Sequence, residues 1–473
     1  MLNNLKHFFY IFIVLCVFVL GLNVYAVHNH LVIVYPRDGA VITANSTFFI
    51  GNTNPKATLT INNKPVKVYS NGAFVRVFDL KQGENLITLK SNFQNDLKEK
   101  NLRIFVKPAQ ASGNNENINK FYPLKKKLIV NEETPLRQTP YGNRLTPVKK
   151  GVIFEAIGVQ NNHYKIELDK DKFAYILKSA THNYSKNYIK NQILDKIFFT
   201  EDAKNIIIKI PLKQFELVEL EQKDNKLSVK INNAQLTFND YIVKSPYIKN
   251  FEFNNNRFVV ELLSNGFYGY DYFYEQGCLV LKIRKPFSKG LRGKIIAIDA
   301  GHGGKELGSV GPTQVPEKDI NLAIALYLKN ILEKKGAIVV LTREEDNFVG
   351  LYKRVEIANA HDADILISIH NNALPDGQNP YVIHGTSTYY YHEQALDLAN
   401  IVQNELLKAT GFINHGVKHG SLVLTRPSMP MSILVEVGFM INPFEYEQLL
   451  VPNNQKAYAM AICDGLRKYF DFE

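Results

Sequence analysis

The stretch IIAIDAGHGG, residues 295–304, decides the fold class of the C-terminal part of the chain. Its first half is an apolar run without alternation, which is typical of a strand buried on both faces of a sheet. Asp299, Gly301 and His302 are therefore expected where the strand meets a loop, and ligands gather at such sheet edges. Taken alone, His302 is more often a histidine held in a turn than a base or a metal ligand. Other segments must decide between these roles.

The residues that follow alternate between strand and helix patterns. Apolar residues recur at helical spacing from residue 319, and Gly336 marks the stop. Further helices are expected at 351–363, 393–411 and 454–470, and strands at 337–343, 364–372 and 432–439. This order predicts an α/β domain over 291–473, with a largely parallel sheet flanked by helices.

The part of the chain before residue 291 predicts N-terminal all-β modules, so the whole is expected to be multidomain. Residues 27–107 hold short alternating runs and resemble an immunoglobulin-like β domain. Residues 108–120 are polar without a period and predict a linker, and 121–182 resemble an SH3-like β-barrel. Residues 183–290 are β-rich, and their aromatic residues at strand spacing favour a core over a carbohydrate-binding platform.

The N-terminal segment 1–26 has the features of a signal peptide. Lys6 precedes a long apolar run, and Ala26 is the small residue that cleavage requires. An uncleaved membrane anchor is the alternative. No later stretch approaches the length of a membrane span, so the chain is expected to be exported, with no stable transmembrane segment after cleavage. Cys278 and Cys463 fall in separate predicted domains and predict no disulfide framework.

The net charge of +11 favours an anionic partner such as a cell envelope. Nucleic acid is not expected, because no clustered basic helix or basic–aromatic motif accompanies the charge. Solvated lysines on every surface account for much of it.

Two further apolar strands carry a polar residue. The run ILISIHNN contains His370, and SILVEVGF places Glu436 inside an otherwise apolar run. A lone buried carboxylate costs several kcal/mol unless a cation or hydrogen bonds compensate it, so Glu436 needs a local reason such as metal or catalysis. Glu317 stands at the start of a helix, where an interaction with the helix N-terminus is the structural alternative.

A series of segments in this order resembles the signature segments of the zinc-dependent N-acetylmuramoyl-L-alanine amidases. They are AIDAGHGG, EKDINLAIALYLKNIL, VVLTR, LYKRVEIAN, ADILISIHNNA, GTSTYYY and ILVEVGFMIN. The resemblance covers about 291–473 and does not extend to 27–290. It implies that one zinc ion is held by His302, Glu317 and His370, and that Glu436 is the catalytic glutamate.

The chemistry of these residue types agrees with that implication. Zinc takes imidazole nitrogen and carboxylate oxygen, and a hydrolytic site leaves one position for water. Zinc lowers the pKa of water toward about 7 and polarises a carbonyl, and Glu436 would carry a proton from water to the departing amine. No serine or cysteine nucleophile is needed.

Several neighbouring residues are candidates for substrate contact or for support of the site. Asn371 and Asn372 follow the second histidine, where many relatives have a small or acidic residue, and both can orient neighbours by hydrogen bonds. Arg343 and Arg354 have the chemistry to bind substrate carboxylates, but an internal ion pair that joins two elements is the favoured reading.

The sequence thus predicts an exported peptidoglycan hydrolase of the periplasm or cell wall. It would cleave the amide between N-acetylmuramic acid and L-alanine, in cell-wall remodelling or daughter-cell separation. Two alternatives stay open: a zinc carboxypeptidase or endopeptidase acting on stem peptides, and a non-catalytic envelope-binding protein. The expected partners are peptidoglycan, toward which the β domains would target the enzyme, and a regulatory or scaffold protein of the envelope.

The loop after the second histidine bears on regulation. Some periplasmic relatives carry a long insertion there, whose helix blocks the zinc. Here the segment is short and contains Pro and Gly, which leaves no room for a packed helix. The sequence therefore predicts an open site.

Overall fold

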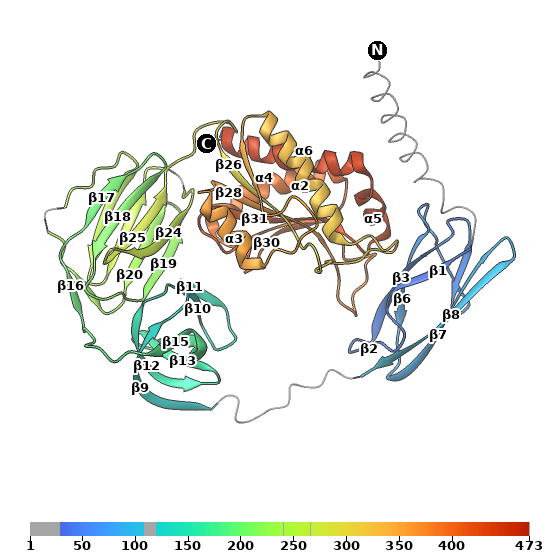
Figure 1. Ribbon diagram of the computed structural model, residues 1–473, viewed down its shortest axis with the longest axis horizontal. Helices are drawn as coiled ribbons and strands as arrows, with labels where there is room; N and C mark the ends of the chain where they lie inside the picture. The colour runs from blue at the N-terminus through green and yellow to red at the C-terminus, as the bar shows by residue number, and fades with distance from the viewer. Residues whose placement is uncertain (1–28, 108–119, 240, 265, 473) are drawn as a thin grey trace, which may run out of the picture.

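The computed structural model describes residues 29–107, 120–239, 241–264 and 266–472 (Figure 1). The predicted signal peptide (1–26) and all but the last residue of the predicted linker (108–120) lie outside the described residues. Within the described ranges, no helix has the length and apolar character needed to cross a membrane. β-rich N-terminal parts precede a C-terminal domain of strands and helices, which confirms the predicted multidomain order.

Residues 29–107, called here the first β region, form two sheets around one apolar core. In β7, Ile87 and Leu89 are buried while the residues between and after them are half-buried, the period of two expected when one face of a strand meets a core. The sheets have the orders β1-β3-β6 and β2-β8-β7-β4-β5. The strands are β1 (Leu31–Tyr35), β2 (Val41–Ile42), β3 (Ser46–Thr53), β4 (Thr58–Ile61), β5 (Lys64–Val66), β6 (Ala73–Asp79), β7 (Gly83–Phe93) and β8 (Asp96–Val106). The immunoglobulin-like assignment stays a prediction.

The next region is one seven-stranded sheet with the order β11-β10-β14-β13-β12-β9-β15. β15, the last of these strands along the chain, pairs with β9, the first, with Thr181 opposite Val130. The SH3-like assignment of residues 121–182 stays a prediction. The strands are β9 (Phe121–Val130), β10 (Thr134–Arg137), β11 (Arg144–Val148), β12 (Ile153–Gln160), β13 (His163–Asp169), β14 (Lys172–Leu177) and β15 (Thr181–Asn183).

The third β-rich region consists of two four-stranded sheets and a parallel pair, β16-β21. Phe238, Phe251 and Phe258 are buried in its core, as expected of core residues rather than of a carbohydrate-binding platform. The sheets have the orders β17-β18-β25-β24 and β19-β20-β23-β22. The strands are β16 (Gln192–Leu194), β17 (Phe198–Glu201), β18 (Asn205–Pro211), β19 (Val218–Lys223), β20 (Lys226–Ile231), β21 (Ala234–Leu236), β22 (Ile248–Asn254), β23 (Arg257–Leu262), β24 (Tyr270–Glu275) and β25 (Cys278–Arg284).

The C-terminal domain has a six-stranded sheet with the order β27-β26-β28-β31-β29-β30. All neighbours run parallel except β29 and β31. The strands are β26 (Ile295–Ala300), β27 (Ile338–Leu341), β28 (Ile365–Asn372), β29 (Thr386–Tyr390), β30 (Asn414–His419) and β31 (Met431–Phe439). The helices are α2 (Glu317–Lys334), α3 (Leu351–Ala360), α4 (Leu396–Thr410), α5 (Pro443–Leu449) and α6 (Pro452–Phe472).

Helices pack on both faces of this sheet. The apolar residues of α2, α4 and α6 meet Ile296, Ile367 and Ile433 in one large core. Successive residues of a strand point to opposite faces, so Ala297, Leu366 and Leu434 meet α3 and the segment around Leu424 on the other side. The second core is much smaller, and polar residues of β28 and β31 continue the same face beyond it.

Four elements of the C-terminal domain differ from those predicted. Strands β29 and β30 and helix α5 were not expected, and α4 begins at Leu396 after a short 3-10 turn, Glu393–Ala395. Helix α5 had a readable signal: Asn442 precedes Pro443 and caps the helix by accepting from the Phe444 and Glu445 backbone N–H groups. Strand β30 had none, because its pattern NHGVKHG is largely polar and contains glycine.

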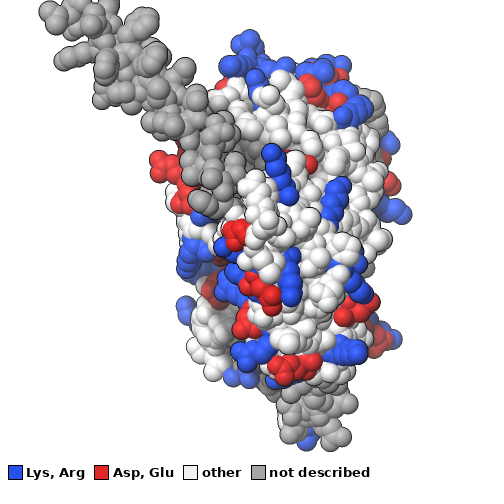
Figure 2. Space-filling model, turned by 90° about the vertical axis from the view of Figure 1, so that its right-hand side faces the viewer, with Lys and Arg blue, Asp and Glu red and all other residues white. Residues whose placement is uncertain are grey.

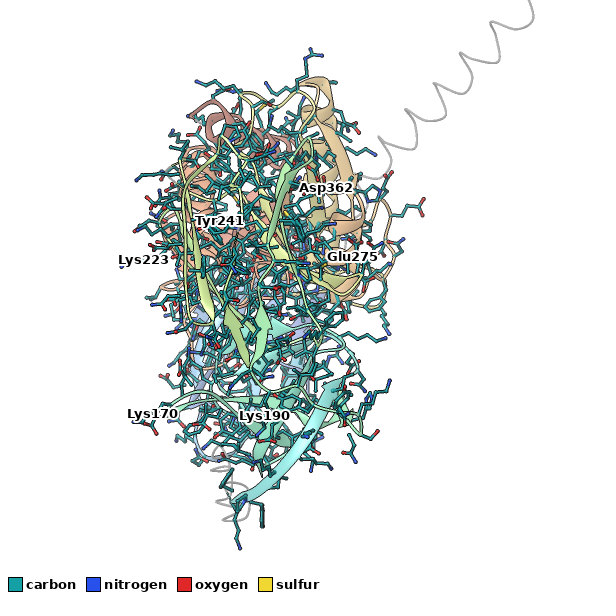
Figure 3. The ribbon with its side chains drawn as sticks, turned by 90° about the vertical axis from the view of Figure 1, so that its left-hand side faces the viewer. Lys170, Lys190, Lys223, Tyr241, Glu275 and Asp362 are labelled. Atoms are coloured by element: carbon teal, nitrogen blue, oxygen red, sulfur yellow. The ribbon has the colours of Figure 1, made fainter. Side chains whose placement is uncertain are left out.

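The first β region lies on one side of the C-terminal domain, and the second and third β-rich regions lie on the other side (Figure 1). Basic and acidic side chains are intermixed on the face shown in Figure 2. On the side shown in Figure 3, Lys170, Lys190 and Lys223 are exposed at separate places. This distribution agrees with the interpretation that solvated lysines account for much of the net charge.

Candidate active site

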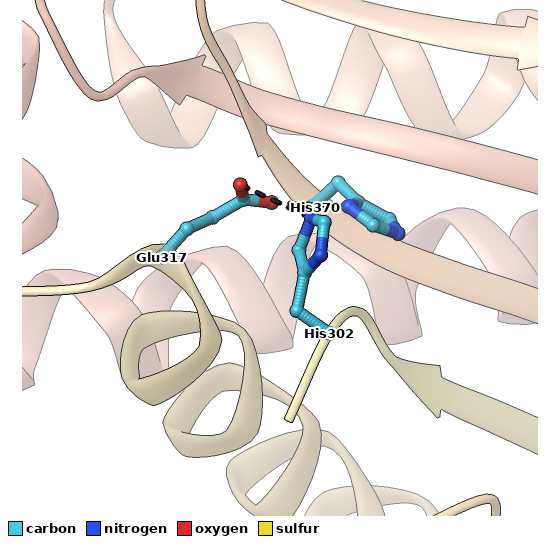
Figure 4. A group of neighbouring side chains, drawn as sticks. All are labelled: His302, Glu317 and His370. Atoms are coloured by element: carbon cyan, nitrogen blue, oxygen red, sulfur yellow. Dashed lines mark hydrogen bonds and ion pairs between the residues drawn. The ribbon is translucent and has the colours of Figure 1, made fainter. Parts of the chain in front are cut away.

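Three predicted site residues converge at the carboxyl edge of the sheet (Figure 4). His302 follows β26, His370 lies on β28, and Glu317 is the first residue of α2. One ligand atom from each lies within 4.8 Å of the others. His302 Nε2 is 3.3 Å from Glu317 Oε2, and His370 Nδ1 is 3.0 Å from Glu317 Oε1. They meet because adjacent parallel strands end at the same edge, and the loop after β26 returns to that edge before α2 begins.

Glycines make this convergence sterically possible. A Cβ atom on Gly301 would lie 2.3 Å from His370 Cε1, and one on Gly308 would lie 2.5 Å from Glu317 Oε2. The loop also holds His302 at a φ of 61°, a left-handed conformation that non-glycine residues adopt uncommonly. The glycines around His302 are therefore needed for the close approach of the two imidazoles.

The electrostatics of the cluster suit a cation. Burial opposes ionisation of the Glu317 carboxyl, but the imidazoles of His302 and His370 hold its pKa well below its ordinary value. Burial would lower the pKa of His370, yet the Glu317 carboxylate raises it to about 9. The carboxylate thus attracts positive charge onto the His370 imidazole, as expected of an anionic site that can accept a metal ion.

The Glu317 carboxylate is oriented by further donors. Oε2 accepts from the Ser309 backbone N–H at 2.9 Å, and Oε1 accepts from the Asn371 N–H and the Asn321 side chain, each at 3.1 Å. Asn371 also donates to Asn321 Oδ1 at 2.8 Å. Asn321 was not predicted from the sequence, although its position four residues after Glu317 places both on one face of α2.

Glu436 lies beside this cluster on β31, directly opposite His370 of β28. Its Oε2 is inaccessible to solvent and has no hydrogen-bond partner within the described ranges. Burial raises the pKa of its carboxyl to about 8. A carboxyl group that titrates near neutral pH is suited to both accepting and donating a proton.

Two neighbours of Glu436 were not foreseen. Ser387 of β29 pairs with Glu436, and Lys418 of β30 lies two strands away, its ammonium 5.8 Å from the ring centre of Tyr389. The positive charge of Lys418 partly offsets the effect of burial on the pKa of Glu436. No motif indicated Lys418, because β30 itself was not predicted.

The remaining candidates divide into supporting and rim positions. Asn371 is buried and belongs to the network that orients Glu317. Asn372 ends β28 and is only half-buried; its side-chain oxygen accepts from the Ala373 N–H, and its carbonyl accepts from the Met440 N–H. Asn372 is thus the nearer of the two to solvent at the edge of the site.

Arg343 and Arg354 are buried and hold the loop that carries His302. Arg354 pairs with Asp299 at 2.7 Å and donates to the carbonyls of Ala300 and His302. Arg343 donates to the carbonyls of Ala300, Gly301 and Lys318. Their donors are engaged within the protein, so neither guanidinium group faces a substrate. Asp299 is the internal counter-ion of Arg354, and this explains the carboxylate at the end of β26.

Comparison with known proteins identifies the family. A family model described as N-acetylmuramoyl-L-alanine amidase matches residues 296–468, which contain the three converging residues and Glu436. The germination-specific N-acetylmuramoyl-L-alanine amidase of Bacillus subtilis is 34% identical over 204 residues, covering 39% of this chain and 84% of the relative. The probable cell wall amidase LytH of Staphylococcus aureus is 32% identical over 182 residues, covering 38% of this chain and 60% of the relative.

Among solved structures, the catalytic domain of CwlV, an N-acetylmuramoyl-L-alanine amidase from Bacillus (Paenibacillus) polymyxa, is 36% identical. It has a TM-score of 0.36, and the match covers 38% of this chain and 99% of that chain. The family model and the Bacillus subtilis relative, most of whose length is covered, agree with each other. The chain belongs to the N-acetylmuramoyl-L-alanine amidase family and is an enzyme of that activity.

Proposed function

We propose that the chain is an exported peptidoglycan amidase that works with one zinc ion held by His302, Glu317 and His370, and with Glu436 as the proton carrier. The observation that carries this proposal is the convergence of the three ligand residues within 4.8 Å, beside a carboxyl group of raised pKa. The bond cleaved is the amide between the lactyl group of N-acetylmuramic acid and L-alanine. A relative named as a probable cell wall amidase supports a location in the wall or periplasm.

The donor set suits zinc. Two imidazole nitrogens and one carboxylate oxygen are the protein ligands that hydrolytic zinc sites commonly use. The hydrogen bonds from Ser309, Asn321 and Asn371 restrict the rotation of the Glu317 carboxylate, and such supporting contacts strengthen metal binding. When bound, zinc would supply Lewis acidity, which polarises the amide carbonyl and lowers the pKa of water.

Glu436 would move the proton. Its carboxyl group would accept a proton from the water that attacks the amide carbon, and in the described ranges no hydrogen bond engages its Oε2. It would then donate that proton to the departing nitrogen as the C–N bond breaks. The products are a lactyl carboxyl group on the sugar and a free α-amino group on L-alanine. The pKa of about 8 keeps both steps accessible near neutral pH.

The loop that follows β28 contributes no helix that would obstruct the site. Residues 373–385, between β28 and β29, contain no helix or strand. The side chains of His302 and His370 are 30% and 18% exposed, whereas that of Glu317 is 5% exposed. We therefore propose an enzyme without a helical plug at this position, as the loop length predicted.

The β-rich regions and the biological setting complete the proposal. The immunoglobulin-like, SH3-like and third β regions would raise the effective concentration of the enzyme on its insoluble substrate. Wall remodelling or daughter-cell separation is the proposed role, and an envelope regulatory or scaffold protein is the proposed partner.

The proposal is tested on purified sacculi with the full-length chain. We expect one zinc per chain, loss of hydrolysis with a chelator, and recovery on addition of zinc. Mass spectrometry of the products should reveal new L-alanine amino termini. Glu84→Gln, at an exposed strand end of the first β region, is the matched control and should behave as wild type.

The stem-peptide alternatives give different termini. A carboxypeptidase or endopeptidase would free an α-carboxyl group between amino acids and leave the lactyl amide intact. That result would overturn the proposed bond specificity. The activity assigned to the chain by its family excludes the non-catalytic alternative.

A further inference from the structure

We infer that the first β region is part of the catalytic unit, because it holds the loop that joins the strand of His370 to the strand beside Glu436. This loop, residues 373–385, is called here the bridging loop. The residues that position it are Tyr35 and Thr47 of the first β region and Asp376 of the loop. The inference rests on the proposed function, and it gives the first β region a role beyond targeting.

The bridging loop borders the site at both of its ends. It leaves β28 three residues after His370, and it enters β29 immediately before Ser387, which pairs with Glu436. Its second half is held partly by its own domain: Asn442 donates to the Pro380 carbonyl at 2.9 Å, and His384 lies 2.7 Å from Glu445.

The first half of the loop is held by the first β region. The Tyr35 hydroxyl donates to Asp376 Oδ2 and the Thr47 hydroxyl to Asp376 Oδ1, each at 2.6 Å. The Gly377 N–H donates to the Ser46 carbonyl at 2.9 Å. No lysine or arginine in the described ranges forms an ion pair with Asp376, so two hydroxyl groups from another region are its partners. Burial and the bond to Asp376 raise the pKa of Tyr35, which keeps its hydroxyl a donor.

An apolar contact accompanies these hydrogen bonds. Phe48, Ile50 and Val75 of the first β region form one buried cluster with Ile441, and Leu374 of the bridging loop packs against it. Ile441 lies two residues beyond β31, the strand of Glu436. Separation of the two parts would expose this cluster to water, so the contact is expected to persist in solution.

The same region contacts the loop that leads to Glu317. Asn52 donates to the Pro312 carbonyl at 2.8 Å, and Pro312 lies between His302 and Glu317 in the sequence. Tyr381, in the second half of the bridging loop, donates to the Val75 carbonyl at 2.7 Å. The first β region therefore contacts two segments beside proposed ligands. One precedes Glu317, and the other follows His370.

A tether and a positioning element predict different kinetics. A tether raises the concentration of enzyme on an insoluble wall and leaves the hydrolysis of a small soluble substrate unchanged. A positioning element affects the soluble substrate equally, because a displaced loop alters the alignment of the bound amide with Glu436. A soluble disaccharide-peptide fragment of peptidoglycan therefore separates the two roles.

The experiment compares full-length variants on that fragment and on sacculi. Asp376→Asn, and the pair Tyr35→Phe with Thr47→Val, should each lower kcat on the soluble fragment about tenfold, with a smaller change in KM. The triple variant should be no worse than the pair, because both remove the same contacts. Thr47→Ser keeps the hydroxyl and should retain wild-type kcat. Zinc content and the midpoint of thermal unfolding should stay close to wild type.

Matched controls and contrary outcomes complete the test. Asp96→Asn and Tyr122→Phe change exposed residues elsewhere and should have no effect. If the Asp376 and Tyr35 variants hydrolyse the soluble fragment at the wild-type rate and lose activity only on sacculi, the first β region is a tether and the inference is wrong. If Asp376→Asn does not fold, Tyr35→Phe alone decides by the same criterion. A wild-type chain inactive on both substrates would instead overturn the proposed function.

Discussion

The first and the third β regions contact the α/β domain at opposite ends of its parallel strands. The first β region contacts loops at the carboxyl ends, through Asp376. The third β region contacts the amino ends: Arg284 donates to both Asp362 oxygens, at 3.2 and 2.9 Å, and to the Ala363 carbonyl, just before β28 begins. Asp362 is labelled in Figure 3 on the side of the molecule that carries this contact.

The difference teaches that contacts of similar chemistry have different consequences at the two edges. In a parallel α/β sheet, the reacting groups gather beyond the carboxyl ends of the strands, and the turns at the amino ends serve the fold. We therefore expect a contact at the carboxyl edge to affect alignment and rate. We expect a contact at the amino edge to affect the free energy of unfolding and to leave the rate unchanged.

The largest effect is expected for Glu436→Gln, which changes the carboxyl edge itself. The substitution keeps the size of the side chain but removes its ability to carry a proton. We expect kcat to fall by about 10²–10⁴, with the fold and the bound zinc retained. The measurement is kcat on the soluble fragment, together with metal analysis and thermal unfolding.

Glu317→Ala provides the contrast to Glu436→Gln. Loss of a ligand should weaken zinc binding, and excess zinc should restore part of the activity. If Glu436→Gln purified without zinc while Glu317→Ala kept both metal and activity, the two roles would have to be exchanged.

Gly301→Ala should come next, because it disturbs the ligand geometry indirectly. The new Cβ would lie 2.3–2.7 Å from three ring atoms of His370, so the imidazole must move. We expect zinc affinity to fall about 10- to 100-fold, measured by competition with a chelating dye. Gly350→Ala is the matched control, because its Cβ meets no atom within 4 Å. Equal zinc affinity in the two variants would show that the glycine is not required.

Asp362→Asn tests the amino edge. Arg284 is 2% exposed, and loss of its charged partner should destabilise the fold by about 1–2 kcal/mol, since Asp364 remains 3.9 Å away. The midpoint of thermal unfolding should fall while kcat on the soluble fragment stays at the wild-type value. Asp96→Asn, which removes an exposed pair with Lys98, should change neither quantity. A decrease in kcat without a change in stability would erase the distinction between the edges.

The smallest effect is expected at Glu216, remote from both edges. Burial raises the pKa of its carboxyl to about 7, against the hydrogen bonds from Gln192, Gln214 and Asn233. The folded state therefore binds the proton more tightly than the unfolded state. This contribution to stability is full at low pH and is lost as pH rises from about 4.5 to about 7.

Glu216→Gln removes that titration. Between pH 5 and pH 8, the wild-type midpoint of thermal unfolding should decrease relative to that of the variant. Asp195→Asn, a nearby exposed carboxylate, is the control and should follow wild type. Parallel pH profiles for wild type and Glu216→Gln would contradict the assignment.

Local patterns were sufficient for much of the C-terminal domain. The spacing of Ile320, Ile324 and Leu328 predicted the buried face of α2, and all three are buried. The apolar runs before His302 and around Glu436 predicted strands, and both residues lie where strands β26 and β31 deliver them to the carboxyl edge. Strand β30 escaped prediction because its neighbours in the sheet, rather than its own composition, make it a strand.

The sequence by itself determined the features that depend on residues close together in the chain. These are the periodicity of apolar residues, the glycines around His302, and the polar residues within apolar runs. Only the tertiary structure decided that Arg343 and Arg354 serve the His302 loop, and that Asn321 orients Glu317. It alone brought Tyr35 to Asp376, 341 residues further along the chain. A hydroxyl–carboxylate contact of this kind leaves no periodic trace in either segment, because it depends on how separately formed β and α/β units pack.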